Sequence, residues 1–236
     1  MEDWIKDCRY IIMPTRQAPE GLEAEYHAAY MTWRKAWEKY REEQNITSHL
    51  RSDGFLLPDE MGVLFYQSQC VGLCCFSHGD LNIGPLSDLG WFSAWDELSL
   101  RRLKNISTKS IICTQFTVDP AFAGKGQVVR WKEIISLFSY LRFYYSDKEV
   151  MAGCLNLTRG MQNSSGEDIG AIILNPIHKF VLGEKEIPAQ LVAYTKEGFE
   201  KFVAKKELAP LCEKLWKQHF HCTEIPLNTQ DIKKAA

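Results

Sequence analysis

The sequence predicts a mixed α/β domain, and three stretches of the 236-residue chain carry that prediction. Residues 110–156 read as strand, turn, helix and strand, a unit that makes two parallel strands. Two apolar runs, residues 61–67 and 71–77, form a predicted antiparallel hairpin. Residues 22–44 carry aromatic and aliphatic side chains at helical spacing, as in a helix packed on a sheet. These stretches favour a sheet that begins antiparallel and becomes parallel around one β–α–β unit.

The other elements follow from shorter apolar runs and their breakers. The further predicted strands are residues 8–13, 171–174, 180–182 and 190–194. The further predicted helices are residues 91–104 and the charged segment 197–220, which is interrupted near Pro210. Neither a linker nor an internal repeat breaks this order. We therefore expect a single domain over residues 1–236, with residues 197–236 as a C-terminal helical extension.

Composition limits the classes of function. The net charge is -2, so the chain lacks the excess of positive charge that is typical of nucleic-acid-binding proteins. No apolar run approaches the roughly 20 residues of a membrane span, and the acidic, polar N-terminus is unlike a signal peptide. Most of the eight cysteines lie in apolar runs, as reduced core residues do. We therefore expect a cytoplasmic protein with no nucleic-acid partner and no membrane span.

Metal and cysteine chemistry are not favoured. Residues 212–222 contain two cysteines and two histidines, but their spacing lacks the C-x-x-C and H-x-x-x-H pairs of common zinc sites. We therefore expect no metal. Cys113 and Cys154 are weak candidates for a nucleophile, because both lie in apolar runs and neither has a histidine near it in sequence.

A glycine-containing turn joins the first strand of the β–α–β unit to its helix. The strand ends at Asp119-Pro120, and the turn continues as Ala-Phe-Ala-Gly-Lys-Gly over residues 121–126. Two glycines before a helix let the backbone approach a ligand, and the free N–H groups of a helix N-terminus favour an anion such as phosphate. The turn is neither a P-loop nor a dinucleotide fingerprint, because the Lys-Ser/Thr pair and the third glycine are lacking. An ordinary β–α turn is an equally good reading of this stretch alone.

The wider pattern resembles a known family. Val118-x-Pro120-x-x-x-Gly124-x-Gly126 is similar to the pyrophosphate-binding turn of the GNAT (N-acetyltransferase-like) superfamily, although Ala121 replaces the usual Gln or Arg. The order of elements looks like the branch that contains the N-acyl amino acid synthases and the acyl-homoserine-lactone synthases. The supporting pieces are the aromatic helix 26–40, Ser52-Asp53-Gly54-Phe55, Val71-Gly72, Thr117–Pro120 and Ile187–Tyr194. The resemblance implies a GNAT-like mixed, centrally splayed sheet flanked by helices, in one acyltransferase-like domain.

The resemblance also implies a reaction. An acyl group would pass from a thioester, carried by CoA or by the phosphopantetheine of an acyl carrier protein, to a small-molecule amine such as an amino acid. The thioester is then a co-substrate, and no cofactor is tightly bound. The many aromatic and aliphatic side chains suit a medium or long acyl chain. Lactone synthesis is disfavoured, because Cys74-Cys75-Phe76 and Ile112–Phe116 replace charged residues of the lactone synthases.

Two alternatives stay open beside this acyltransferase, an enzyme that would transfer acyl groups other than amino-acyl groups. One is a non-catalytic GNAT-like domain that binds an acyl thioester or a partner protein, which the alanine at position 121 favours. The other is an acetyltransferase for small acyl groups. A pocket deep enough for a fatty chain would separate the two enzymes.

The resemblance assigns donor-binding residues. Backbone N–H groups on the strand before the turn, near Phe116 and Val118, would meet the thioester carbonyl. Backbone N–H groups of the turn would meet the phosphates. These residues are Ala123, Gly124, Lys125, Gly126 and Gln127.

The catalytic candidates are polar residues near strand ends. Direct transfer needs little of the protein, because an α-amine has a pKa of about 8 and a weak base suffices near neutral pH. His78 follows the second hairpin strand, Gln115 can orient a water, and Asn156 ends the second strand of the β–α–β unit. Asp80, Thr158 and Tyr194 are further candidates.

Overall fold

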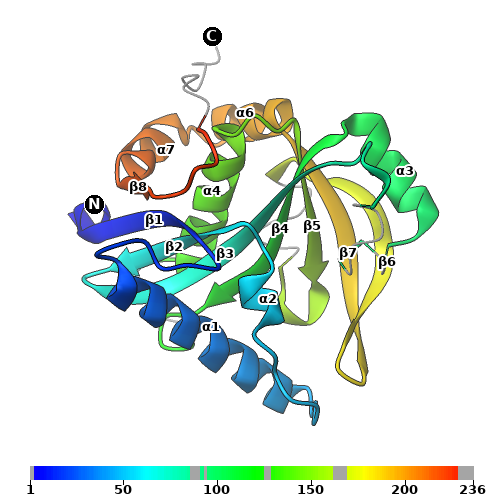
Figure 1. Ribbon diagram of the computed structural model, residues 1–236. Helices are drawn as coiled ribbons and strands as arrows, with labels where there is room; N and C mark the ends of the chain where they lie inside the picture. Colours follow the sequence, from blue (N-terminus) through cyan, green and yellow to red (C-terminus); the bar gives the residue numbers. More distant parts are fainter. Residues whose placement is uncertain (1–2, 86–90, 93–94, 125–128, 162–168, 228–236) are drawn as a thin grey trace. The chain divides into compact units, whose positions relative to one another are not determined.

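The computed structural model describes residues 3–85, 91–92, 95–124, 129–161 and 169–227. Within them, eight strands form a mixed sheet in the order β6-β7-β5-β4-β3-β2-β1-β8 (Figure 1). The strands are β1 (Cys8–Pro14), β2 (Glu60–Tyr66), β3 (Gln69–Asp80), β4 (Lys109–Val118), β5 (Val150–Asn156), β6 (Ile172–Leu182), β7 (Lys185–Thr195) and β8 (His219–His221). The helices are η1 (Asp3–Asp7), α1 (Glu23–Glu43), α2 (Asp53–Leu56), α3 (Glu97–Ile106), α4 (Trp131–Tyr144), η3 (Leu157–Arg159), α6 (Lys196–Lys205) and α7 (Ala209–Trp216). The predicted mixed α/β class is confirmed.

The chain forms two compact units. Unit 1 comprises Met1–Ser77, Thr114–Arg142 and Pro210–Pro226, and unit 2 is built from His78–Cys113 and Phe143–Ala209. The chain passes from one unit to the other within β3, β4, α4 and α7. Each unit has its own buried cluster of apolar side chains.

Unit 1 is organised by the predicted hairpin. β2 and β3 pair antiparallel from Glu60↔Phe76 to Tyr66↔Gln69, with one bulge between Leu64 and Phe65. β1 pairs antiparallel with β2 along its whole length. The hairpin is therefore confirmed, and β2, which is paired on both edges, has buried side chains from Glu60 to Phe65.

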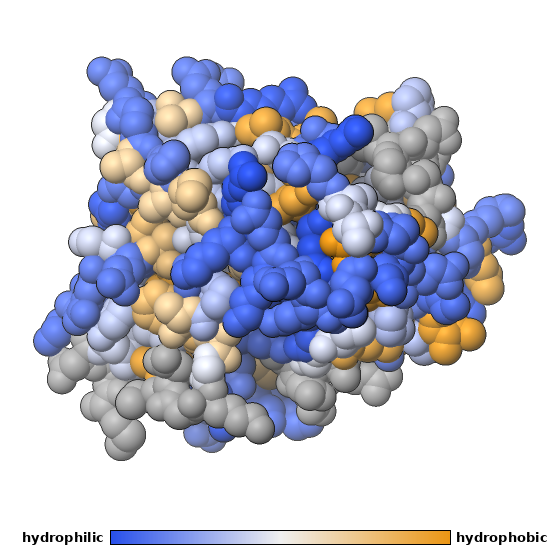
Figure 2. All heavy atoms as spheres, turned by 90° about the horizontal axis from the view of Figure 1, so that it is seen from below, coloured by the Kyte–Doolittle hydropathy of each residue, from blue (hydrophilic) through white to orange (hydrophobic). Residues whose placement is uncertain are grey.

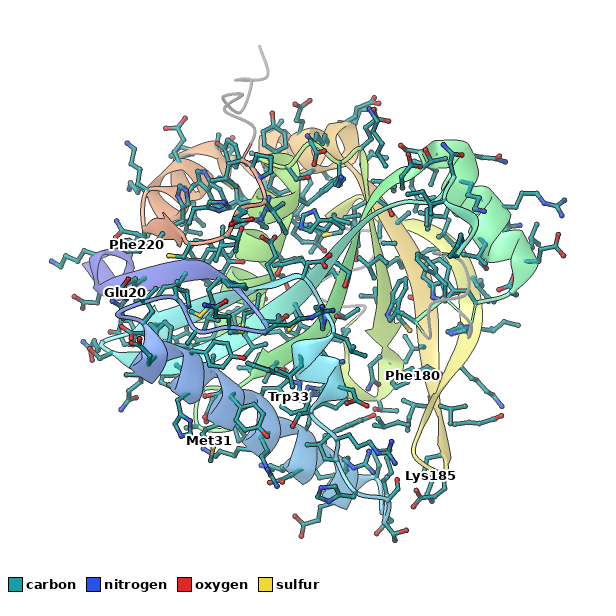
Figure 3. The ribbon with its side chains drawn as sticks, in the orientation of Figure 1. Glu20, Met31, Trp33, Phe180, Lys185 and Phe220 are labelled. Atoms are coloured by element: carbon teal, nitrogen blue, oxygen red, sulfur yellow. The ribbon has the colours of Figure 1, made fainter. Side chains whose placement is uncertain are left out.

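Helix α1 covers its unit with an aromatic stripe, as the helical spacing of residues 22–44 predicted. Trp33 is 2% exposed and contributes to the core cluster with Ala29 and Phe55. Trp33 points from α1 toward the strands, whereas Met31, on the opposite side of the helix, is 48% exposed (Figure 3). Helix α1 is therefore amphipathic, with its polar side in solvent.

Hydrophilic side chains predominate on the face drawn in Figure 2, and hydrophobic side chains form smaller patches there.

Unit 2 contains the parallel pair of the β–α–β unit. β4 and β5 are paired from Ser110↔Val150 to Cys113↔Gly153, whereas β4 continues to Val118 and β5 to Asn156. β5 pairs antiparallel with β7, and β7 with β6. The parallel register thus ends before either strand does, as a centrally splayed sheet requires.

Two elements of unit 2 differ from the sequence prediction. Residues 171–174 and 180–182 were predicted as separate strands, but β6 is one strand of 11 residues with register shifts between Ile173 and Asn175 and between Asn175 and His178. Pro176 lies within the second of these shifts and cannot donate a ladder hydrogen bond, so the strand bulges there and continues. Helix α3 begins at Glu97, not residue 91, because the Asp96 side chain accepts a hydrogen bond from Ser99 N (2.8 Å) and caps the helix.

The C-terminal segment contains α6 and α7, as the helical pattern of residues 197–220 predicted, and also a strand. β8 pairs parallel with β1 through Tyr10↔His219 and Ile12↔His221. Sequence patterns did not predict β8, because three residues are too few for a periodic signal.

Candidate functional site

Gln115 distorts β4 at its centre. Its φ angle is +54°, a left-handed conformation that is uncommon for a residue with a side chain. The strand is buried from Ser110 to Ile112 but half-buried from Cys113 to Phe116. A left-handed residue within a strand turns its neighbouring peptide groups out of the ladder, and such irregularities recur next to active sites.

Helix α1 donates hydrogen bonds to alternate residues of this distorted segment. Trp33 Nε1 donates to Gln115 Oε1 (2.9 Å), and Trp37 Nε1 donates to Thr117 Oγ1 (3.2 Å). Thr117 Oγ1 in turn donates to the backbone oxygen of Gln115 (2.7 Å). The indole groups of α1 therefore hold the second half of β4 in its irregular path.

Helix α2 lies against the Gln115 side chain. A Cβ atom at Gly54 would lie 2.8 Å from Gln115 Nε2 and 3.0 Å from Gln115 Cδ. That is closer than real Cβ contacts come, so Gln115 fits here because residue 54 is glycine. Phe55 packs on Trp33 with ring centroids 5.6 Å apart. The stretch Ser52–Phe55, which carried part of the family resemblance, thus contacts the distorted strand.

Asp119 organises the start of the turn after β4. Its backbone N–H donates to Val71 O (2.8 Å), and its carboxylate accepts from Ala121 N (2.7 Å) and from Lys35 Nζ (3.1 Å). Phe122 N donates to Asp119 O (2.8 Å). In the sequence, Asp119 stands out only as the residue before Pro120. The aspartate before the turn is a signal that could have identified this role. An aspartate side chain readily accepts a hydrogen bond from the backbone N–H two residues later in the chain.

The turn itself is described as far as Gly124. Ala123 and Gly124 are exposed, and Ala123 N makes a long hydrogen bond to Pro120 O (3.4 Å). A Cβ atom at Gly124 would meet no atom within 4 Å, so open space adjoins this glycine. The other predicted phosphate-binding residues, Lys125, Gly126 and Gln127, lie outside the described residues.

Helix α4 begins later than predicted. The apolar pattern placed its start near Val128, but α4 begins at Trp131, and Val129 and Arg130 precede it. Consecutive β-branched residues have low helix propensity, which accounts for the later start.

The three predicted catalytic residues fall in different units. Gln115 is in unit 1, together with the donor-site candidates Phe116 and Val118, whereas His78 and Asn156 are in unit 2. His78 is half-buried near the end of β3. The Oδ1 atom of Asn156 accepts from Thr158 N (2.9 Å) and Thr158 Oγ1 (2.8 Å).

The remaining candidates are placed as follows. Asn156 caps η3 through its bonds to Thr158, so both residues have a local structural role. Asp80 accepts a hydrogen bond from Asn82 N (3.0 Å), which lowers the pKa of its carboxyl. Tyr194 is 4% exposed in the core of unit 2.

Cysteine and metal chemistry have little support in the described residues. Burial raises the pKa of the Cys154 thiol to about 12, which keeps it protonated and poorly nucleophilic. Burial does the same to Cys212. The described part of the chain holds no group of three His, Cys, Asp or Glu side chains placed to bind a metal ion.

No described helix has the length and apolar character needed to cross a membrane.

Comparisons with known proteins support the fold. No protein-family model matches the chain, and no curated protein sequence matches it. The solved structure of FeeM, an N-acyl amino acid synthase from uncultured soil microbes, is similar with a TM-score of 0.55 and 14% identity, covering 85% of this chain and 98% of FeeM. The structure of BjaI, a CoA-dependent acyl-homoserine lactone synthase with SAM and isopentyl-CoA, gives a TM-score of 0.54 and 8% identity, covering 95% and 96%. The predicted GNAT-like fold, which the chain shares with these two solved structures, is therefore confirmed.

Proposed function

We propose that this protein is an N-acyltransferase that moves an acyl group from a CoA or acyl-carrier-protein thioester to an amine such as an amino acid. The observation that carries the proposal is the left-handed Gln115 within β4, held by Trp33 and fitted against Gly54. The fold that this chain shares with FeeM and BjaI supports the same reaction class, because FeeM is an N-acyl amino acid synthase and BjaI a CoA-dependent acyl-homoserine lactone synthase.

The distorted strand supplies a means of polarising the thioester. Direct transfer requires an N–H donor aimed at the carbonyl oxygen, which becomes negatively charged as the amine attacks. Peptide groups turned out of a ladder are free to donate, so the N–H groups near Phe116 and Val118 are the proposed donors. One such donor is worth about 100-fold in rate in other acyl-transfer enzymes.

The turn after β4 is the proposed site for the pyrophosphate of the donor. Ala123 and Gly124 are exposed, and a ligand can approach the backbone at Gly124 without meeting a side chain. Asp119 stabilises the start of the turn through Ala121 N and Lys35. Lys125, Gly126 and Gln127 complete the proposed phosphate contacts. The structure of BjaI was solved with isopentyl-CoA, which supports CoA as the carrier.

The proposed acyl chain is medium or long, since aromatic side chains such as Trp33 and Phe55 cluster beside the distorted strand. The donor remains a co-substrate in this proposal, and a single acyltransferase domain spans residues 1–236. The protein acts in the cytoplasm, where acyl thioesters are made.

A non-catalytic acyl-thioester-binding domain is the second candidate. One observation favours it: two of the predicted catalytic side chains, Gln115 and Asn156, are engaged by structural partners, Trp33 and Thr158. Such a domain would bind the donor and release no thiol.

The test measures donor binding and thiol release with acyl-CoA and acyl-carrier donors of several chain lengths, against a pool of amines and amino acids. Release that requires an amine supports the enzyme, and its length profile separates long-chain transfer from acetyl transfer. Gly124→Asp is expected to abolish donor binding, because it places a carboxylate beside the phosphates.

Gly84→Asp is the matched control, since a Cβ at Gly84 also meets no atom within 4 Å. Binding without release, lost in Gly124→Asp but kept in Gly84→Asp, supports the non-catalytic candidate. No binding of any donor by the wild-type protein contradicts both.

A further inference from the structure

The side-chain amide of Gln115 has a fixed orientation. Trp33, which points from α1 toward α2 and the strands, donates its indole N–H to this amide at 2.9 Å (Figure 3). An indole nitrogen can only donate, so the atom that it meets must be the amide oxygen. The other end of the amide is therefore Nε2, which carries two N–H donors.

This Nε2 group faces α2. It is the atom nearest to a Cβ built on Gly54, at 2.8 Å. Within the described residues, the Gln115 side chain makes no hydrogen bond besides the one from Trp33, so neither N–H of Nε2 has a partner there. Gln115 and Gly54 are both half-buried, which means that solvent reaches them. Two N–H donors that are held in place, open to solvent and unused by the protein are available to a ligand.

Gln115 projects from the face of the sheet that α1 covers. Gln115 and Thr117 alternate along β4, and both accept indole hydrogen bonds from α1. Side chains stand roughly perpendicular to a sheet, whereas backbone N–H groups lie in its plane. The thioester of the proposed donor would meet backbone groups near Phe116, in that plane. The Gln115 amide is therefore placed to meet the other reactant, the acceptor, as it approaches over this face.

A second group of polar atoms lies beside the start of α2. The Tyr30 hydroxyl and Ser52 Oγ are 3.0 Å apart, and Arg34 Nη1 lies 3.5 Å from the Tyr30 oxygen. The hydrogen bond with Ser52 and then that from Arg34 lower the pKa of Tyr30, although Glu38, which pairs with Arg34 at 2.7 Å, opposes the shift. These surroundings favour negative charge on an oxygen. Tyr30 and Ser52 are half-buried, so this group is open to solvent as well.

We propose that this face of unit 1 binds the acceptor as an α-amino acid, with Gln115 Nε2 donating to its carboxylate. The inference rests on the proposed acyltransferase function and names the acceptor class. A hydrogen bond to a charged oxygen stabilises a complex more than one to a neutral oxygen. A simple amine has no oxygen to accept this bond. Gln115 is then the residue that makes the enzyme specific for amino acids.

The specificity of the wild-type protein is the first test. Thiol release from saturating acyl-CoA is measured with pairs of an amino acid and the amine that lacks its carboxylate, such as phenylalanine and phenethylamine. The concentration of neutral amine is kept equal within a pair, because the two compounds differ in pKa. We expect kcat/KM to be about 10- to 100-fold higher for the amino acid, the range for one hydrogen bond to a charged group. A wild-type enzyme that uses the simple amines equally well overturns the inference and leaves the acyltransferase in place.

Gln115→Glu is the second test, because glutamate keeps the oxygen that accepts from Trp33 and removes only the Nε2 donors. We expect kcat/KM for phenylalanine to fall about 10-fold or more, since one carboxylate now faces another. The value for phenethylamine should fall by no more than threefold, and acyl-CoA binding should be unchanged. An equal loss with both acceptors overturns the inference, because it would give Gln115 a role in transfer or in folding rather than in recognition.

Gly54→Ala displaces the amide by steric contact, since the added methyl group would lie 2.8 Å from Nε2. It should raise KM for phenylalanine and leave KM for phenethylamine unchanged, and equal changes in both would contradict the inference. The controls are Gln17→Glu, at an exposed glutamine, and Gly84→Ala, where a Cβ meets no atom within 4 Å. Both should leave every parameter unchanged. A wild-type protein that binds acyl-CoA but releases no thiol with any acceptor removes the proposed function, and the inference with it.

Discussion

The indole N–H of Trp33 reaches Gln115, 82 residues away in sequence, and bonds its side-chain oxygen at 2.9 Å. Gln115 is the residue at which β4 adopts a left-handed backbone, so the bond joins the middle of α1 to the point of greatest distortion in the strand. A left-handed glutamine costs free energy, and this one persists because the residues around it hold it in place.

Trp33→Phe tests this relationship by deleting the donor and keeping the aromatic packing on Phe55. We expect a loss of about 1 kcal/mol in the free energy of unfolding, the usual worth of one hydrogen bond. Turnover should fall more than acyl-CoA binding, because the strand geometry at Phe116 is altered. Urea unfolding and thiol-release kinetics measure the two effects. Met31→Leu, on the exposed side of α1, should change neither, and a Trp33→Phe enzyme with full turnover would contradict the role given to the bond.

Asp119 offers a contrast between charge and hydrogen bonding. Its ion pair with Lys35 is weak, since the lysine side chain is 58% exposed, whereas its bond to Ala121 N is short at 2.7 Å. Asp119→Asn keeps an acceptor for that N–H and should cost less than about 1 kcal/mol in stability. Asp119→Ala leaves the N–H without its acceptor and should cost about 1–2 kcal/mol and weaken acyl-CoA binding. Equal effects of the two substitutions would show that the charge, not the hydrogen bond, matters.

Arg142 and Glu60 form an ion pair whose side chains are both 0% exposed, with Nε and Oε1 2.7 Å apart. Glu60 Oε2 also accepts from Thr223 Oγ1 (3.1 Å), which connects β2 to the segment after β8. Removing one member of the pair leaves the other as an unpaired buried charge. Arg142→Met should therefore lower the free energy of unfolding by about 3–5 kcal/mol.

Adding Glu60→Gln to Arg142→Met should recover part of that loss, because no unpaired charge remains. Arg101→Ala is the control, since its partner Glu97 is on the surface and the pair is worth less than about 1 kcal/mol. The comparison is made by urea unfolding at constant pH. A double variant no more stable than Arg142→Met would mean that packing, not charge, dominates at this position.

Stability should also fall with acidity because of two histidines, His178, which is buried, and His221, which is half-buried. Burial lowers the pKa of His178, and burial followed by the charge of Arg142 lowers that of His221. In the unfolded chain both titrate near 6.5, so below that pH the unfolded state binds more protons than the folded state. Their contribution to stability is complete above about pH 6.5 and is lost as the pH falls toward the folded-state values.

Thermal unfolding from pH 8 to 5 checks this dependence. His221→Asn should flatten the curve in that range, whereas His27→Gln should leave its slope unchanged because His27 is exposed. A slope in His221→Asn identical to that of the wild-type protein would exclude His221 as a source of the acid sensitivity.

The sequence predicted those parts of the fold that local patterns specify. The hairpin, helix α1 and the β–α–β unit follow from periodicity and from residues such as Pro120 that end a strand. The bounds of α3 and α4 were less accurate, because capping by Asp96 and the poor helix propensity of Val128-Val129 outweigh the apolar pattern. The continuity of β6 past Pro176 and the strand β8 were missed, because both depend on pairing with a distant strand.

Local sequence was enough to establish the fold class and to point to the glycine turn, because strand and helix periods and turn residues act over a few positions. It placed Gln115 on the central strand and Trp33 in an aromatic stripe, but did not connect them. The folded chain alone shows that Trp33 and Gly54 hold Gln115, and that the Gln115 amide faces α2. Those relationships are set by strand register and helix docking, which bring together residues far apart along the chain and which no local pattern encodes.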